Sequence, residues 1–305
     1  MQKYAFYLML CKKSGQKCYI DTTFFLQKNS WNGYELGHLF NIKAPDMKNV
    51  LTQDAIERIT NNTTSYLKEN LEFLTSNNNE ICYYFLGNRQ VYKSYGKIHE
   101  KYRILKHKFL MIKLMIFGQQ SIYPRSFFCE KNNSYFDEYL MRSDELFRDV
   151  KEDVIRVFQF PAFCDEKNIR TSELMKLNDS VAVHVRRTDH LGDNGKLYKR
   201  KYYAKSINCI RDKTGKKLSF YIFSDDIEWC KNHLSELGLL VDDDLTFVDW
   251  NSGVDSFRDM QLMTYCHHNV LAISSFSWWG YYLSPYKDKI VCAPEGYWTE
   301  VEFHF

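Results

Sequence analysis

Two adjacent arginines follow a short apolar run in the second half of the chain. The segment reads Val183-His184-Val185-Arg186-Arg187-Thr188-Asp189. A guanidinium keeps its charge at every working pH and presents a planar fork of donors to phosphate oxygens. Two guanidiniums that leave a buried strand need anionic partners, so the segment is typical of a diphosphate site. The alternative is that Arg186 lies on the sheet surface and pairs with Asp189. The position at a strand end favours phosphate binding.

A second cluster carries hydroxyl groups and reads Ser274-Ser275-Phe276-Ser277-Trp278-Trp279. The serines stand at the start of an expected helix, where backbone N–H groups and the helix dipole favour an anion. The two tryptophans suit either a sugar or the core, and we expect at least one of them to pack in the core. The cluster predicts a second set of phosphate contacts.

Acidic residues occur in two short runs and at one isolated position. Ser224-Asp225-Asp226 and Asp242-Asp243-Asp244 could hold a divalent cation beside a nucleotide diphosphate. Each run also fits a plainer structure, because the first suits a helix N-terminus and the second a solvated turn. The plainer structures are favoured, so no metal site is predicted. Asp259 stands alone beside Arg258, in a helix expected to begin near Val254, and by itself would be a solvated surface residue.

Several common catalytic motifs are missing from the sequence. It contains no G-x-G-x-x-G, P-loop, G-x-S-x-G or H-E-x-x-H pattern. Phosphate recognition therefore has to rely on arginine and on helix termini. The nine cysteines are an odd number without a C-x-x-C pair, which predicts reduced thiols in a cytoplasmic protein.

Short apolar runs alternate with helical patterns from residue 180 to the end, which is typical of βαβ units with a parallel sheet. The expected strands are 181–185, 218–223, 245–248, 270–273 and 290–292. A polar cluster follows each of them. Since ligands of open α/β sheets bind at the carboxyl ends of the strands, these clusters should line one crevice.

The length of 305 residues predicts two domains. Residues 143–158 read as a helix capped by Ser143, and the polar stretch 162–178 reads as the connection between the domains. We expect an N-terminal domain over residues 1–165 and a Rossmann-like domain over residues 175–305.

Composition narrows the classes of partner. The 41 Lys and Arg balance 38 Asp and Glu to a net charge of +3, which makes nucleic acid an unexpected partner. Aromatic residues make up 16% of the chain and suit a dense core better than a carbohydrate-stacking surface. No apolar run reaches the roughly 18 residues of a membrane span. The basic stretch 101–113 suits either an anionic membrane surface or, preferably, a solvated helix face.

Three segments in this order resemble the bacterial α-1,2-fucosyltransferases of glycosyltransferase family 11. They are 183–189, 220–229 and 274–280. Weaker matches are 135–139, 158–161 and a strand over 15–21 after the first helix. The resemblance implies an α/β, GT-B-like fold of two Rossmann-type domains facing a cleft. The C-terminal domain would be a parallel sheet with flanking helices that binds the donor, and the N-terminal domain would bind the acceptor.

The resemblance also implies a reaction. The chain would transfer fucose, with inversion, from GDP-L-fucose to the 2-hydroxyl of a terminal galactose on a glycan or lipid-linked oligosaccharide, without a metal or other cofactor. Arg186 and Arg187 would neutralise the GDP leaving group, and Asp189 would be the general base. The remaining substrate-binding residues implied for the site are His184, Asp225, Asp226, Asp259, Ser274, Ser275 and Ser277.

The resemblance has a departure at the start of the chain. Members of the family open with a strand and a Gly-Gly-Leu-Gly-Asn-Gln loop, and residues 1–6 match only the tail of that motif. Two hypotheses follow: either the start lies upstream, or the chain is a GDP-sugar-binding relative without catalysis. A transferase of another nucleotide sugar is a third. The expected location is the cytoplasm, with peripheral contact to the inner membrane as an option.

Overall fold

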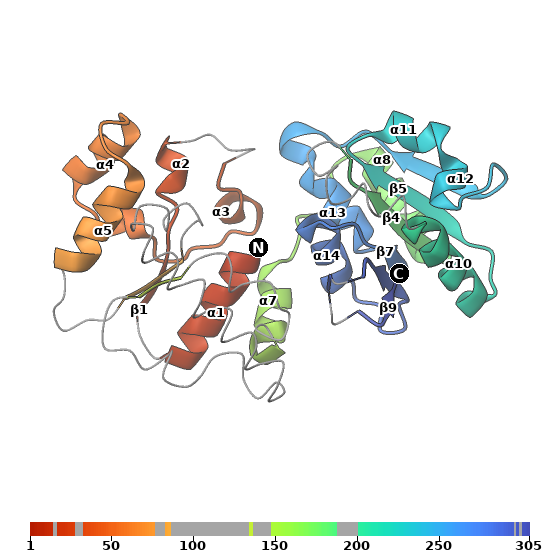
Figure 1. Ribbon diagram of the computed structural model, residues 1–305, viewed down its shortest axis with the longest axis horizontal. Helices are drawn as coiled ribbons and strands as arrows, with labels where there is room; N and C mark the ends of the chain where they lie inside the picture. The colour runs from red at the N-terminus through yellow and green to blue at the C-terminus, as the bar shows by residue number, and fades with distance from the viewer. Residues whose placement is uncertain are drawn as a thin grey trace. The chain divides into compact units, whose positions relative to one another are not determined.

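A computed structural model describes residues 1–14, 17–27, 33–76, 83–86, 134–136, 148–187, 201–295, 297–298 and 301–305 (Figure 1). The chain divides into two compact units, Met1–Gln159 and Phe160–Phe305. The division falls earlier than the expected connection over residues 162–178. That stretch instead contains the helix α8 (Glu166–Leu177), which Asp165 caps by accepting a hydrogen bond from the backbone N of Asn168 at 2.8 Å.

The first unit has a three-stranded parallel sheet in the order β1-β2-β3. Its strands are β1 (Lys17–Ile20), β2 (Tyr83–Leu86) and β3 (Ser134–Phe136), and β1 confirms the strand expected over residues 15–21. Among the residues described in this unit the helices are α1 (Gln2–Ser14), α2 (Phe24–Gln27), α3 (Leu36–Leu39), the 3-10 helix η1 (Met47–Asn49), α4 (Gln53–Thr60), α5 (Tyr66–Ser76) and α7 (Lys151–Val157). The helix expected over 143–158 is described only from residue 148 onward, so Ser143 lies outside the described residues.

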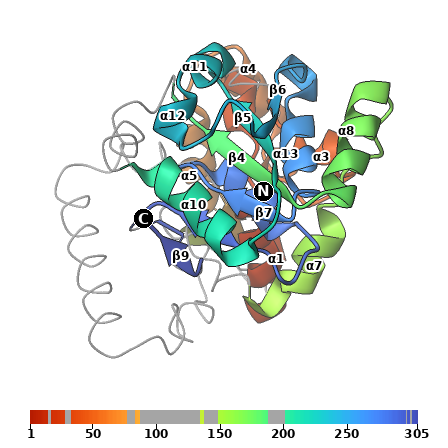
Figure 2. The same ribbon diagram turned by 90° about the vertical axis from the view of Figure 1, so that its right-hand side faces the viewer.

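The second unit has a six-stranded parallel sheet in the order β6-β5-β4-β7-β8-β9 (Figure 2). The strands are β4 (Ser180–Val185), β5 (Ser219–Ser224), β6 (Asp244–Val248), β7 (His268–Val270), β8 (Val291–Ala293) and β9 (Phe303–His304). The structure confirms the five strands expected from the sequence, to within a few residues at their ends, and adds β9. The helices in the described part of this unit are α8, α10 (Tyr202–Thr214), α11 (Ile227–Asn232), α12 (Leu234–Leu237), the 3-10 helix η6 (Gly253–Asp255), α13 (Phe257–Met263) and α14 (Ser275–Tyr282).

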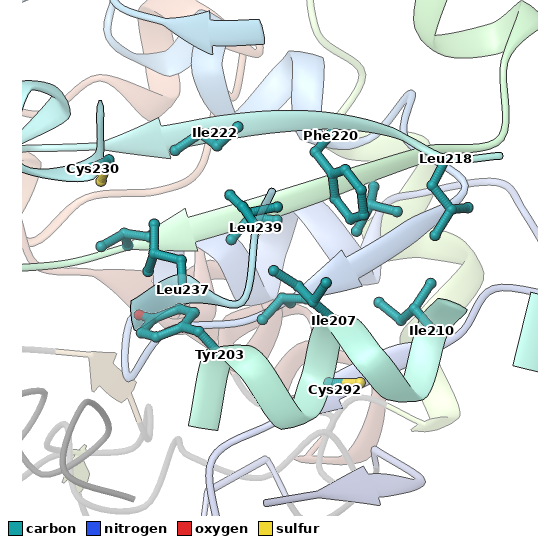
Figure 3. Close-up of a cluster of buried hydrophobic side chains, with 14 of the residues drawn as sticks. Tyr203, Ile207, Ile210, Leu218, Phe220, Ile222, Cys230, Leu237, Leu239 and Cys292 are labelled. Atoms are coloured by element: carbon teal, nitrogen blue, oxygen red, sulfur yellow. The ribbon is translucent and has the colours of Figure 1, made fainter. Parts of the chain in front are cut away.

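Helices cover both faces of this sheet, which explains why β4 is buried along its whole length. Side chains of a strand alternate between the two faces. Val181, Val183 and Val185 of β4 belong to one cluster of buried side chains. Figure 3 labels other members of this cluster, among them Ile207 and Ile210 of α10. Ala182 packs in a second cluster with Met175 of α8 and with α13. Figure 2 shows α10, α11 and α12 on one side of the strands and α8 and α13 on the other.

The strand order places a topological switch beside β4. From β4 the chain proceeds through β5 to β6 on one side and then returns to place β7 on the other side of β4. The segments that leave β4 and β7 therefore diverge at the carboxyl edge of the sheet. In open α/β sheets this is the point at which ligands bind.

A buried tyrosine joins two strands of this sheet and gives a test of the packing. The hydroxyl of Tyr202 on α10 lies 2.6 Å from the carbonyl O of Leu271 and 2.9 Å from that of Cys292. Tyr202→Phe removes the donor but keeps the ring, so we expect a loss of about 1–3 kcal/mol in the free energy of unfolding. Urea denaturation measures this loss, and an unchanged midpoint would contradict the hydrogen bond.

Candidate functional site

The two arginines leave the sheet directly after β4, beside the topological switch. The Nε of Arg186 lies 3.3 Å from Oδ2 of Asp225, and the Nε of Arg187 lies 3.0 Å from Oδ2 of Asp226. The backbone N of Arg187 also donates to Oδ1 of Asp225 at 2.9 Å. Each guanidinium is thus held by its own aspartate from the next strand. An aspartate that holds Nε fixes the direction in which the guanidinium fork points.

Local sequence explains how Asp226 can hold Arg187. Asp226 caps α11, because its Oδ1 accepts from the backbone N of Trp229 at 3.2 Å, while its Oδ2 meets the guanidinium. Asp226 is fixed in turn by Ser224, whose Oγ accepts from the backbone N of Asp226 at 3.0 Å. The helix-start interpretation of Ser224-Asp225-Asp226 is therefore correct for Asp226, and the same carboxylate also positions an arginine.

Trp229 is a member of the site that the sequence analysis missed. The Cζ of Arg187 lies 3.8 Å from the centroid of the Trp229 ring, which is a cation–π geometry. The same indole stacks on His233 at 4.4 Å with an interplanar angle of 10°. The signal in the sequence was the position of Trp229 at the end of the first turn of α11, three residues after the capping aspartate.

The serine cluster divides into accessible and buried members. Ser274 caps α14 by accepting from the backbone N of Phe276 at 3.3 Å, and Ser275 is exposed as the first residue of the helix. Ser277 is 1% exposed, and its Oγ lies 3.3 Å from both the backbone N of Ala272 and the carbonyl O of Ser274. Ser277 therefore holds the turn between β7 and α14. This placement leaves the half-buried Ser274 and the exposed Ser275 at the start of the helix.

The two tryptophans that follow are buried. Trp278 is 2% and Trp279 is 3% exposed, and their rings meet edge to face with centroids 4.8 Å apart. This confirms the core interpretation of the pair.

His184 is the second-last residue of β4 and lies on the face covered by α8 and α13, because it follows Ala182 by two residues. Its ring centroid lies 5.8 Å from that of Phe276 on α14. Its Nδ1 is buried and has no hydrogen-bond partner among the described residues. Burial, helped by the charge of Arg186, lowers the pKa of His184 to about 4. The imidazole is therefore neutral at pH 7 and holds an unsatisfied polar nitrogen at the switch.

This histidine predicts a loss of stability in acid. Between its ordinary pKa of 6.5 and about 4, the unfolded chain binds a proton that the folded chain excludes. Stability conferred by the neutral His184 is present above pH 6.5 and falls as the pH drops toward 4. At pH 5 the expected loss is about 2 kcal/mol relative to pH 7. Urea unfolding of wild type and His184→Asn at both pH values measures it, and equal losses in the two proteins would contradict the prediction.

Asp259 lies in the first turn of α13, on the same face of the sheet as His184. Its Oδ1 accepts a hydrogen bond from Nδ2 of Asn251 at 2.8 Å, whereas its Oδ2 has no hydrogen-bond partner among the described residues. Burial raises the pKa of Asp259 to about 7, and the donor from Asn251 acts in the opposite direction. The plain expectation of a solvated residue is not met, because Asp259 is half-buried and hydrogen-bonded to Asn251.

The second acidic run has structural partners at the opposite edge of the sheet. Oδ2 of Asp243 lies 2.5 Å from Nη2 of Arg211, and Oδ2 of Asp244 accepts from Oγ of Ser219 at 2.6 Å. Within the described ranges no group of three His, Cys, Asp or Glu side chains is placed to hold a metal ion. Asp242 and Asp243 thus lie in the turn before β6, and Asp244 is the first residue of that strand.

Some predicted features cannot be placed. Asp189, the predicted general base, lies outside the described residues, as does the basic stretch 101–113. The described helices include none that is both long and apolar enough to pass through a bilayer.

The sheet thus gathers two aspartate-held guanidiniums and a helix start at its topological switch, and both kinds of group can bind phosphate oxygens. The sequence profile of glycosyl transferase family 11 matches residues 60–304, and the chain belongs to this family.

Curated relatives agree with this assignment. The chain is 31% identical over 180 residues to an alpha-1,2-colitosyltransferase of Escherichia coli, a match that covers 57% of this chain and 56% of the relative. It is 30% identical to the O-antigen biosynthesis glycosyltransferase WbnK of Escherichia coli, over 48% of this chain and 46% of that one. It is 28% identical to the human galactoside alpha-(1,2)-fucosyltransferase 1, over 34% of this chain and 28% of that one. The chain thus spans about half the length of each of the two bacterial relatives.

Proposed function

We propose that the chain is a galactoside α-1,2-L-fucosyltransferase that moves fucose from GDP-L-fucose to the 2-hydroxyl of a terminal galactose, with inversion. The observation that carries this proposal is the pair of guanidiniums at the end of β4, each held by one aspartate after β5. Membership of family 11 and the activities for which the relatives are named support the linkage and the class of acceptor.

The guanidiniums and the start of α14 fit the diphosphate of the donor. Arg186 and Arg187 would neutralise the charge that grows on the diphosphate as the glycosidic bond breaks. The start of α14 follows β7, the neighbour of β4. Its backbone N–H groups, together with Ser274 and Ser275, would donate hydrogen bonds to the phosphate oxygens of the donor. Because the positive charge comes from side chains, we expect turnover to persist in EDTA.

His184 and Asp259 fit the nucleoside, because both lie on the α13 face of the sheet. The Watson–Crick edge of guanine carries N1–H and N2–H donors, which an ionised carboxylate accepts. Adenine presents an acceptor at N1 instead. Asp259 in its ionised form would therefore select guanine, and the unsatisfied Nδ1 of His184 is available for a second polar contact.

Transfer itself needs a base as well as a leaving group. In the proposed step the galactose O2 attacks the anomeric carbon of fucose from the face opposite GDP and loses its proton to Asp189. The O2–C1 bond forms as the bond from C1 to the phosphate oxygen breaks, and GDP leaves with that electron pair. Asp189 keeps this role as a prediction from the family motif.

The donor sugar has a second candidate, colitose, which is fucose without its 3-hydroxyl. The 31% identity to a colitosyltransferase favours it. The two donors share the diphosphate and the guanine, so the site described above serves either of them. Fucose and colitose differ only in the 3-hydroxyl, so discrimination between the two donors depends on the residues that contact C3 of the sugar.

A donor panel tests the proposal. Purified protein with a β-galactoside acceptor is given GDP-fucose, GDP-colitose, GDP-mannose or UDP-galactose, and nucleotide release is measured with and without acceptor. We expect acceptor-dependent release from GDP-fucose. Faster release of GDP from GDP-colitose than from GDP-fucose would identify colitose as the donor sugar in place of fucose. Binding of GDP without any turnover would support the non-catalytic alternative.

The location of the reaction follows from the acceptor. We propose a cytoplasmic enzyme that acts on glycans or on lipid-linked oligosaccharides at the inner membrane. Flotation with anionic vesicles tests the membrane contact: recovery of the protein with the vesicles would support it.

A further inference from the structure

A polar network of the second unit ends at Asp259, and its other side chains have no part in the chemistry above. It joins α8, the segment after β6 and α13 through the side chains of Asp165, Asn168, Trp250, Asn251 and Asp259. Asn168 is at its centre and is only 2% exposed. Because Asn168 is buried, leaving any donor or acceptor of its amide unmatched would be costly, so the directions of its hydrogen bonds are informative.

The orientation of the Asn168 amide is set by two groups of fixed polarity. Trp250 Nε1, which can only donate, lies 2.9 Å from Oδ1 of Asn168. Oδ2 of Asp165, which as a carboxylate only accepts, lies 2.9 Å from Nδ2 of Asn168. A flipped Asn168 would place donor against donor and acceptor against acceptor. Asn168 therefore has one allowed orientation.

Asn168 transmits this orientation to Asn251. The two amides form a reciprocal pair, in which Nδ2 of Asn168 donates to Oδ1 of Asn251 at 2.8 Å and Nδ2 of Asn251 donates back at 3.1 Å. The same Nδ2 of Asn251 donates its second hydrogen to Oδ1 of Asp259 at 2.8 Å. The donor that reaches Asp259 is thus fixed from α8, through two side chains.

We propose that Asn168 and Asn251 are positioning residues that hold Asp259 by one oxygen and present its other oxygen, in the charged state, to the guanine of the donor. The inference rests on the proposed function. A hydrogen bond donated to a carboxylate favours its charged form. Burial works against that form and brings the pKa of Asp259 to about 7, so the Asn251 donor sets how much of Asp259 is ionised at neutral pH.

Charged groups near the network are already engaged or lie on its rim. Arg258 donates to the carbonyl O of Pro161 at 2.8 Å and to Oε1 of Gln261 at 2.7 Å, and Nζ of Lys167 lies 3.9 Å from the centroid of the Trp250 ring. The titratable and charged groups on the segments that carry or flank the network, apart from Asp259 itself, are Asp165, Glu166, Lys167, Arg170, Glu173, Lys176, His184, Asp249, Asp255 and Arg258. The removal of Asn251 changes none of these charges.

The test is the pH dependence of GDP affinity, measured calorimetrically from pH 5.5 to 8.5. Wild type should bind more tightly as the pH rises, with a midpoint near 7. In Asn251→Ala the lost donor leaves Asp259 harder to ionise, so the midpoint should move up by about one pH unit. Trp250→Phe keeps an aromatic ring beneath Lys167 and should move the midpoint the same way by less.

Asn70→Ala is the matched control. Asn70 is fully buried in the first unit, and its Nδ2 donates to Oδ2 of Asp21 at 2.9 Å. Its loss should lower the melting temperature and leave the GDP midpoint unchanged. If the pH midpoint of GDP affinity in Asn251→Ala equalled that of the wild type, the inference would be overturned. If the midpoint moved in Asn251→Ala but not in Trp250→Phe, the positioning role of Asn168 would be overturned. Failure of the wild type to bind GDP would instead overturn the proposed function.

Discussion

Replacing Arg187 with alanine should reduce kcat for transfer by about 10²–10³-fold, the usual effect of losing one preorganised donor to a developing negative charge. The guanidinium is fixed by Asp226 at 3.0 Å and by the face of Trp229 at 3.8 Å, so it meets the diphosphate without reorganisation. Arg187→Lys keeps the charge but loses the planar fork, and we expect it to recover only part of the rate. Steady-state GDP release at saturating acceptor measures both variants.

Arg211→Ala is the control for this experiment. Arg211 also makes an ion pair, to Asp243 at 2.5 Å, and also lies over an aromatic ring, with Cζ 5.2 Å from the centroid of Phe220. It stands at the amino edge of the same sheet, away from the switch. Its loss should affect stability but not kcat. If Arg187→Ala and Arg211→Ala turned over at the same rate, the diphosphate would not be bound where we place it.

Asp259→Asn should weaken GDP binding by about 10–100-fold at pH 8, because a charged acceptor for guanine is worth about 1.5–3 kcal/mol. The sign of the pH dependence follows from the pKa of about 7: the ionised form binds, so wild-type affinity rises between pH 6 and pH 8. The variant has no carboxylate to ionise there and should show a flat profile. Calorimetric titration with GDP and ADP measures affinity and base selectivity together.

Asp255→Asn controls for the change in net charge. Asp255 is exposed on η6, four residues before Asp259, and it should bind GDP as wild type does at every pH. A flat wild-type profile, or equal selectivity for GDP over ADP in Asp259→Asn and wild type, would show that the base lies elsewhere.

The sheet of the second unit could be predicted because its strands are continuous apolar runs between helices. β4 is buried throughout, and a strand that is buried on both faces appears in the sequence as a nearly continuous apolar run. Two elements, α8 and β9, could not be predicted from the sequence, for different reasons. α8 buries Asn168, Thr171, Ser172 and Met175, so it shows almost no apolar stripe, and its polar composition was interpreted as a connection. β9 has two residues and no pattern to read.

The sequence allowed us to predict most residues of the site, but few of the contacts between them. The arginines, Ser274 and Ser275 stand at the strand ends where the pattern placed them. The partners of the arginines could not be assigned, since Asp225 and Asp226 come from the neighbouring strand and the sequence offered Asp189 equally well. Ser277 matched the expected helix start, but its position on the helix turns it inward. The Asn168–Asn251 pair joins residues 83 positions apart and leaves no local signal.

The most direct measurement is a crystal structure of the protein with GDP. We expect the diphosphate within hydrogen-bond distance of Arg186 and Arg187 and of the start of α14, and guanine N1–H and N2–H directed at Asp259. A nucleotide bound away from the carboxyl ends of β4 and β7, or with its base turned from Asp259, would contradict the account.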